Sequence, residues 1–482
     1  MVPPPILASS EIPAWLEALR KADVEAVLLP VLVQLIVILL TARLFAVLFR
    51  KMGQPAVVGE IAAGLVLGPS VLKALLPSVW EMIFHPTIPG LPPEVAAGLS
   101  DQVFRWIFTT LSQVGLVLLL FLVGLEFDFS HLRWHGKAAL AISVTGVVLP
   151  FVLGLGLAPL LLAHPHLHGE GEVAARPLGF ALFLGTALSI TAIPILGRMM
   201  MELNITRTRL GAITIAAAAV DDATGWILLA AVAAIVRAQF DPKMTLLMAA
   251  ETVAFGVAMV LLAKPVLRWW VRGALRRNDG EISLNALAVL LALIMGCAII
   301  TNLIGIFAIF GAFFLGAVLS GEHEFRQAVS RRLRDFVSAF FLPIFFTYTG
   351  LRTDIGTLGD PGLWLLCGLV TVAAVVGKFV GCGLAAWLSG FSPREAGCIG
   401  AMMNTRALMA LIVINLGAEL GVIPRSVFCM LVLMALITTV MTTPLLLRLM
   451  RGTELEPYIL RSGFVPAPPS PDAAEPAPAD RQ

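Results

Sequence analysis

Apolar stretches of about 20 residues follow one another along nearly the whole chain, and a helix of about that length crosses a lipid bilayer. Of the 482 residues, 59% are hydrophobic and only 13% are charged. Soluble domains carry about 25% charged residues. The mean hydropathy of +0.93 points the same way. The sequence therefore predicts an all-α polytopic membrane protein.

Thirteen such stretches can be marked out, so we expect about 13 transmembrane helices in a transporter domain at 26–450. One set of alternate loops carries about twice as many Lys and Arg residues as the other, which predicts an outward N-terminal segment at 1–25 and a cytoplasmic C-terminus. The Pro- and Ala-rich tail at 451–482 is expected to be disordered. The stretches cover roughly 26–49, 54–75, 105–126, 138–162, 177–200, 208–236, 244–270, 282–301, 304–320, 335–351, 361–389, 395–418 and 424–449.

Two adjacent acids, Asp221 and Asp222, lie in the middle of the stretch Leu210–Val236, which holds no other charge. A carboxylate at the centre of a bilayer costs roughly 2.5–3.5 kcal/mol on insertion scales. Burial disfavours its charged form, and a nearby cation restores it. Adjacent helical residues point about 100° apart, so the two acids are expected to face different surroundings. This pattern predicts a site that binds and releases protons or cations inside the membrane.

Lys378 is the expected partner of one of these acids. It lies alone near the midpoint of the segment between Asp360 and Arg394, at the depth of the two carboxylates. An unpaired ammonium there is as unfavourable as an unpaired carboxylate, so pairing with one aspartate is the least costly arrangement. Snorkelling to the interface is the alternative, but the position is too deep for it.

Two stretches are predicted to be broken helices. In the first, Pro194 removes a backbone hydrogen bond, and Thr191 supplies a hydroxyl oxygen close to the freed carbonyls. In the second, Asn404, Thr405 and Arg406 fall at the centre of the span. Paired interrupted helices in two halves of a transporter mark its binding site. The alternatives are a plain kink at Pro194 and an Arg406 that neutralises the carboxyl ends of the half-helices.

An internal repeat joins the two halves of the chain. GEIAAGLVLGPS at 59–70 has an echo in GAFFLGAVLSG at 311–321, and GLEFD at 124–128 has one in GLRTD at 350–354. The echoes are seven spans apart, which predicts a second copy inverted in the membrane. Inverted repeats with a site at their interface are a transporter architecture. We expect repeat one at about 26–236, a linker helix at about 244–270 and repeat two at about 282–449.

At these residues the chain resembles the monovalent cation/proton antiporter superfamily, in the branch of bacterial sodium/proton and potassium/proton antiporters related to plant cation/proton exchangers. The resemblance covers roughly 30–450. The segments that carry it are GQPAVVGEIAAGLVLGPS, LLFLVGLEFD, ALSITAIPILGRM, AAAAVDDATGW, LPIFFTYTGLRTD, GKFVGC and MNTRALMALIV.

The resemblance implies two discontinuous crossing helices, a core domain that moves against a dimerisation domain, and a homodimer. It implies that Asp222 carries the ion and the proton, that Asp221 pairs with Lys378, and that exchange is electrogenic. The family commonly reads NTRG and ELIV where this chain has Ala407 and Ala410. A carboxylate near the crossing is therefore missing, which leaves the choice among sodium, potassium and lithium open.

The sequence therefore predicts a secondary antiporter of the bacterial inner membrane that exchanges Na⁺ or K⁺ for protons by alternating access. It predicts no enzyme activity, no cofactor and no metal beyond the transported cation. The net charge of +2 gives no basic field to suggest nucleic acid. Two alternatives stay open: a channel-like cation efflux pathway and a sodium-coupled solute symporter of related fold.

Overall fold

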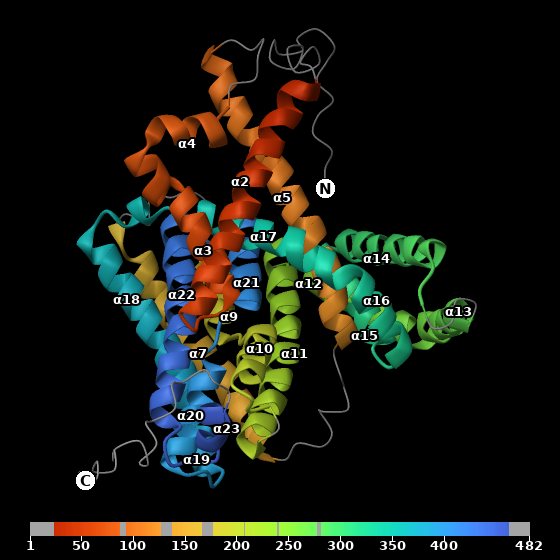
Figure 1. Ribbon diagram of the computed structural model, residues 1–482, viewed down its shortest axis with the longest axis vertical. Helices are drawn as coiled ribbons and strands as arrows, with labels where there is room; N and C mark the ends of the chain where they lie inside the picture. Colours follow the sequence, from red (N-terminus) through yellow and green to blue (C-terminus); the bar gives the residue numbers. More distant parts are fainter. Residues whose placement is uncertain are drawn as a thin grey trace, which may run out of the picture. The chain divides into compact units, whose positions relative to one another are not determined.

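The structure, a computed structural model, describes residues 24–86, 93–126, 137–165, 177–206, 208–238, 241–276 and 281–461 (Figure 1). Within these ranges the regular elements are helices, and there are no strands. The expected outward segment at 1–25 lies almost wholly outside the described residues. The chain divides into two compact units, the first formed by 1–50, 56–128 and 233–361 and the second by 51–55, 129–232 and 362–482. Each unit combines segments from both predicted repeats.

The helices confirm a polytopic all-α membrane protein. Each of the thirteen predicted stretches coincides with one helix or with a short series of helical segments. In the described part of the chain, nine helices are long and apolar enough to cross a bilayer, or ten if one bent pair is a single span. Two further apolar helices, Pro177–Ser189 and Ala308–Leu319, are shorter than a full span. The number thirteen therefore stays a prediction.

In the first unit, the helix Leu284–Ile304 (α14) is bounded by ordinary end signals. Ser283 caps α14 by accepting a hydrogen bond from the Ala286 N–H at 3.2 Å, and Gly305 ends that helix with a φ of +101° that favours glycine. The unit contains α2 (Val24–Lys51), α3 (Ala56–Leu67), η1 (Pro69–Lys73), α4 (Pro77–Phe84), α5 (Pro93–Glu126), α12 (Pro242–Ala258), η3 (Met259–Ala263), α13 (Lys264–Arg276), α14 (Leu284–Ile304), α15 (Ala308–Leu319), α16 (His323–Phe336), η4 (Val337–Phe341), α17 (Leu342–Leu351) and η5 (Ile355–Leu358).

Glycines of the two sequence echoes pack crosswise in this unit. Gly64 on α3 lies against Gly350 on α17, and Gly124 on α5 lies against Gly316 on α15. A Cβ atom at any of the four would collide with the backbone of the facing helix. The first motif of each half thus meets the second motif of the other, as a two-fold relation between repeats would require. Residues 127–128, the end of one echo, lie outside the described residues.

The second unit holds the two interrupted spans. Its helices are α7 (Lys137–Leu162), α9 (Pro177–Ser189), α10 (Ile193–Glu202), most of α11 (Arg209–Arg237), α18 (Pro361–Val375), η6 (Val376–Val380), α19 (Gly381–Leu388), α20 (Pro393–Met403), α21 (Leu408–Glu419), α22 (Arg425–Leu449) and α23 (Glu456–Arg461). A capping box of Ser392 and Glu395 starts α20, with Pro393 in its first turn. The pair α20 and α21 bends by 43° at its break.

The prediction of a disordered tail from residue 451 is wrong for its first part. After α22 the chain forms α23, and Leu455 and Ile459 are fully buried in the apolar cluster that also holds Leu210. Glu454 accepts a hydrogen bond from the Leu210 N–H at 2.5 Å, at the start of α11. Two apolar residues and one helix cap outweigh the polar composition of the segment. Residues 462–482 lie outside the described residues.

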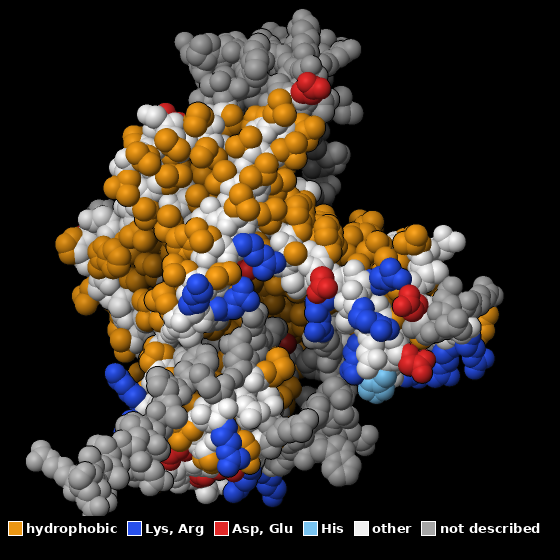
Figure 2. All heavy atoms as spheres, in the orientation of Figure 1, with side chains coloured by type: hydrophobic (Ala, Val, Ile, Leu, Met, Phe, Trp, Pro, Cys, Tyr) orange, Lys and Arg blue, Asp and Glu red, His pale blue; other side chains and the backbone are white. Residues whose placement is uncertain are grey.

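The outer surface of the first unit suits a lipid surrounding. Leu29, Ile36, Leu40 and Leu44 on α2 are each more than half exposed. Figure 2 shows apolar side chains over much of the visible face of α2 to α4, while Lys and Arg side chains gather at α13 and α16. Exposed leucines and isoleucines in such numbers are expected where hydrocarbon chains, and not water, form the surroundings.

Candidate functional site

The centre of the second unit is an ion pair between two fully buried side chains. Lys378 Nζ donates to Asp221 Oδ2 at 2.6 Å, and both side chains have 0% exposure. The lysine lies in η6, a π turn within the span that begins with α18, and π turns inside helices are frequent at functional sites. The lysine is enclosed by α7 as well, because a Cβ atom at Gly146 would lie 3.7 Å from its Nζ. The structure therefore pairs the ammonium with the first of the two acids.

Asp222 has different surroundings from its neighbour. It is 3% exposed, and no ion pair reaches it within the described residues, although its Oδ1, like the Oδ1 of Asp221, has no hydrogen-bond partner there. Trp226, which lies one helical turn further along α11, is also buried. In the described part of the second unit, Asp221 and Asp222 are the buried carboxylates. A buried carboxylate oxygen without a donor is unfavourable unless a proton or a cation occupies it.

The two chain breaks are hydrogen-bonded to each other next to these acids. The Ala192 N–H, between α9 and α10, donates to the Thr405 carbonyl oxygen at 3.0 Å. The Thr191 hydroxyl donates to the Met403 carbonyl oxygen at 3.0 Å. The Thr191 N–H donates to Asp221 Oδ2 at 3.0 Å. The Asp-Asp helix is thus tied to both interrupted spans through Thr191.

The buried side chain of Arg406 links the two interrupted spans to their neighbours. Its guanidinium donates through Nη1 to the Ala187 carbonyl oxygen at 3.1 Å and through Nη2 to the Ala374 carbonyl oxygen at 3.0 Å. Ala187 lies in the last turn of α9, where carbonyls lack helical partners, and Ala374 lies two residues before the π turn of Lys378. The backbone of Arg406 exchanges hydrogen bonds with the Thr439 hydroxyl on α22. Through its side chain and its backbone, Arg406 thereby joins α9, α18 and α22 around the acids.

Replacing Arg406 with lysine should lower the melting temperature of the purified protein by several degrees. A lysine keeps the charge, but its single ammonium cannot reproduce a planar fork that reaches two carbonyls. Each lost hydrogen bond to a charged donor is worth roughly 1.5–3 kcal/mol.

The matched control is Arg394→Lys. That exposed arginine also donates to a carbonyl, that of Arg451 at 3.1 Å, but at the surface. Its effect should stay within about 0.5 kcal/mol. Equal shifts for the two variants in a thermal unfolding series would show that the buried fork is not a structural clamp.

Other residues picked out by the sequence are placed as follows. Pro194 is in the first turn of α10, so the chain breaks just before it, at 190–192. Asn404 is 1% exposed, and neither of its side-chain polar atoms has a hydrogen-bond partner in the described residues. Ala407 and Ala410 are buried at the start of α21.

Sequence reasoning missed two partners of this site, Thr439 and the Ala374 carbonyl. Thr439 belongs to a run of four threonines in the last apolar helix, at 438–439 and 442–443, and all four are buried. A cluster of hydroxyls in an apolar span was a usable signal, because such side chains need acceptors inside the bilayer. The Ala374 carbonyl has no signal in the sequence, since every residue carries such a group.

The chain matches the description "Sodium/hydrogen exchanger, transmembrane" over residues 36–449, which is most of its length. It belongs to the sodium/hydrogen exchanger family. It is 38% identical over 424 residues to the Na⁺/H⁺ antiporter NhaS4 of a Synechocystis strain, covering 88% of this chain and 97% of that protein.

This sodium/hydrogen exchanger is also similar to a plant protein and to a solved structure. It is 36% identical over 440 residues to cation/H⁺ antiporter 20 of Arabidopsis thaliana, covering 88% of this chain but 49% of that protein, so it spans about half of that relative's length. The solved sodium proton antiporter MjNhaP1 of Methanocaldococcus jannaschii superposes with a TM-score of 0.59 at 15% identity, covering 89% of this chain and 98% of that one. At that identity the likeness establishes the fold alone.

Proposed function

We propose that this protein is a secondary antiporter that exchanges a monovalent cation, Na⁺ or K⁺, for protons at Asp222. The observation that carries the proposal is the buried Asp222, which no ion pair reaches within the described residues, beside a buried Asp221–Lys378 pair where two interrupted membrane spans meet. Membership of the sodium/hydrogen exchanger family and the names of the relatives support it.

Asp222 is the better carrier because Asp221 is already engaged. Asp221 Oδ2 accepts from both Lys378 and the Thr191 N–H, whereas no ion pair reaches Asp222 within the described residues. The Oδ1 atoms of both acids have no hydrogen-bond partner there. In a dry surrounding, a carboxylate must be either protonated or bound to a cation. These two states exclude each other, which is the competition that coupled exchange requires.

We propose that Thr191 helps to hold the dehydrated cation. Its hydroxyl hydrogen is used on the Met403 carbonyl, so its oxygen lone pairs remain as acceptors. Carboxylate and hydroxyl oxygens suit hard cations such as Na⁺ and K⁺. With Ala410 in place of an acid, the crossing contributes no carboxylate from the start of α21.

We infer that exchange is electrogenic, with more than one proton for each cation. If a cation bound between both acids, it would weaken the hold of Asp221 on Lys378, and the ammonium could then release a second proton. Two protons moved against one cation transfer a net charge. The buried, closely paired Lys378 supports this step, because an ammonium that loses its counter-ion in a dry site favours its neutral form.

We also propose residence in a bacterial inner membrane as a homodimer, with the N-terminus outside and the C-terminus in the cytoplasm. The distribution of Lys and Arg among alternate loops supports the orientation. The exposed apolar face of α2 offers surface for a second copy.

The full chain reconstituted into liposomes with an imposed pH gradient tests the function. Adding Na⁺, K⁺ or Li⁺ outside should collapse the gradient, as read by a pH-sensitive dye, and clamping the membrane potential should speed the collapse if exchange is electrogenic. Cation flux that leaves the pH gradient intact would instead indicate a channel. Collapse that requires an organic solute would indicate a symporter.

A further inference from the structure

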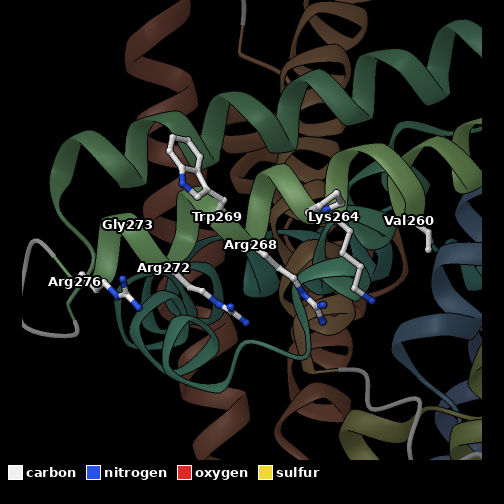
Figure 3. Close-up of a pocket in the computed structure, with 8 residues that line it drawn as sticks. Val260, Lys264, Arg268, Trp269, Arg272, Gly273 and Arg276 are labelled. Atoms are coloured by element: carbon white, nitrogen blue, oxygen red, sulfur yellow. The ribbon is translucent and has the colours of Figure 1, made fainter.

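Helix α13 carries a row of four cations that the exchange site does not use. Lys264, Arg268, Arg272 and Arg276 follow one another at intervals of four residues, which puts them on one side of the helix. Figure 3 shows their side chains directed to the same side of α13, with Trp269 pointing the other way. Leu267, Val271 and Leu275 are buried and anchor the helix.

The four basic side chains of α13 line a cavity. A cavity of about 550 Å³ opens along α13, lined by the four cations together with Val260, Pro265, Trp269 and Gly273 (Figure 3). A Cβ atom added at Gly273 would meet nothing within 4 Å, so the space beside the row is open. Trp270 fixes the helix from another side through an edge contact with Phe325 on α16, at 6.3 Å between ring centroids.

The length of the helix puts this hollow at the depth of lipid headgroups. The span Leu246–Arg276 has 31 residues, which at 1.5 Å per residue is about 46 Å, against a hydrocarbon core of about 30 Å. Its apolar part ends at Ala263, just before Lys264. Only 17% of the most apolar window of this span is buried, so the helix faces its surroundings along most of its length.

Neighbouring acids balance only part of the positive charge. Glu322 pairs with Arg268 at 3.2 Å and with Arg272 at 3.4 Å. Glu324 and His323 line an adjoining hollow with Arg272 and Arg276. Within the described ranges, no carboxylate forms an ion pair with Lys264 or Arg276. Among the described residues, four cations thus face the two acids Glu322 and Glu324, and an excess of positive charge remains there.

We propose that the hollow along α13, with Lys264, Arg268, Arg272 and Arg276, binds the headgroup phosphates of anionic phospholipids. Clusters of basic residues at the end of a membrane helix attract anionic lipids, at about fivefold in affinity for each residue near the surface. Trp269 is 78% exposed, and exposed tryptophan prefers the interface between headgroups and acyl chains. Glu322 fixes the two central arginines in place, and the two outer cations are open to phosphate.

The test uses the purified full chain in a non-ionic detergent, titrated with phosphatidylglycerol, with phosphatidylcholine or with inorganic phosphate. Phosphatidylglycerol should raise the melting temperature and be retained in native mass spectra, and the other two additives should do neither. The variant Lys264→Gln/Arg276→Gln should need about 25-fold more phosphatidylglycerol for half of the shift. Gly273→Glu, which adds an acid to open space, should weaken the response, whereas Gly273→Ala should leave it intact.

A control matched in charge is Arg331→Gln/Arg448→Gln, because both arginines are exposed and lie outside α13. This variant should respond as the wild type does. The proposal is overturned if both double variants respond alike, or if inorganic phosphate gives the same shift and competes with the lipid. It is also overturned if the shift follows protein concentration and dimer formation instead of lipid, because the face would then belong to a second copy. None of these outcomes depends on whether the protein transports ions.

Discussion

Asp222→Asn should reduce cation-driven collapse of a pH gradient to the level of empty liposomes, while the protein stays folded. Asparagine is nearly isosteric, but it can neither take up a proton at neutral pH nor neutralise a cation. Asp222 Oδ1 has no hydrogen-bond donor in the described structure, and the asparagine oxygen can still accept the hydrogen bond that Asp222 receives from the Trp226 side chain. We therefore expect an unchanged or slightly raised melting temperature.

Glu251→Gln is the matched control for this variant. It also converts an acid in an apolar helix to an amide, but Glu251 is exposed on α12, in the other unit. Its exchange rate should stay close to that of the wild type. Retained exchange in Asp222→Asn, at any cation concentration and with the protein shown to be folded, would remove Asp222 from the carrier role.

Lys378→Met should destabilise the protein by about 3–5 kcal/mol, the usual result of removing one partner of a buried ion pair. The loss arises from Asp221, which is left charged with no exposure to solvent and keeps only the Thr191 N–H on its paired oxygen. Since an unpaired Asp221 can escape by taking up a proton, the loss should be larger in alkaline than in acidic solution. Thermal unfolding across a pH series measures this.

The double variant Asp221→Asn/Lys378→Met separates the two contributions. It removes both charges, so most of the lost stability should return, because a neutral pair in place of a buried ion pair is often close to neutral in free energy. Exchange should become electroneutral or fail, since the second proton carrier is gone. If the double variant were as unstable as Lys378→Met, packing of the lysine stem, and not charge pairing, would explain the single variant.

The apolar spans and the membrane class could be read from the sequence because they depend on local quantities. A helix in a bilayer satisfies its own backbone, so length and hydropathy along the chain suffice to place α2, α7 or α22. The same holds for the depth of Asp221, Asp222 and Lys378, which is set by their distance from the ends of their spans. The breaks before Pro194 and at 404–407 also follow from local residues.

The prediction of disorder is wrong at residues 451–461 because the contacts that order this segment are not local in sequence. The segment is polar on average, but Leu455 and Ile459 are fully buried against helices far away in sequence. The average composition of a tail does not predict that two of its apolar residues will pack against distant helices. Nothing in the local sequence states that Glu454 will cap α11.

The sequence by itself thus determined that this protein has membrane-spanning helices and that two acids and one ammonium lie near the middle of their spans, because hydropathy and charge act on each helix separately. The residue pattern left open which acid the ammonium binds and the family resemblance pointed to Asp221, and the tertiary structure shows that pairing at 2.6 Å. Only the tertiary structure decided that Arg406 would join the end of α9 to the π turn of Lys378. These choices depend on directions and distances between helices, and a linear pattern of residues does not contain them.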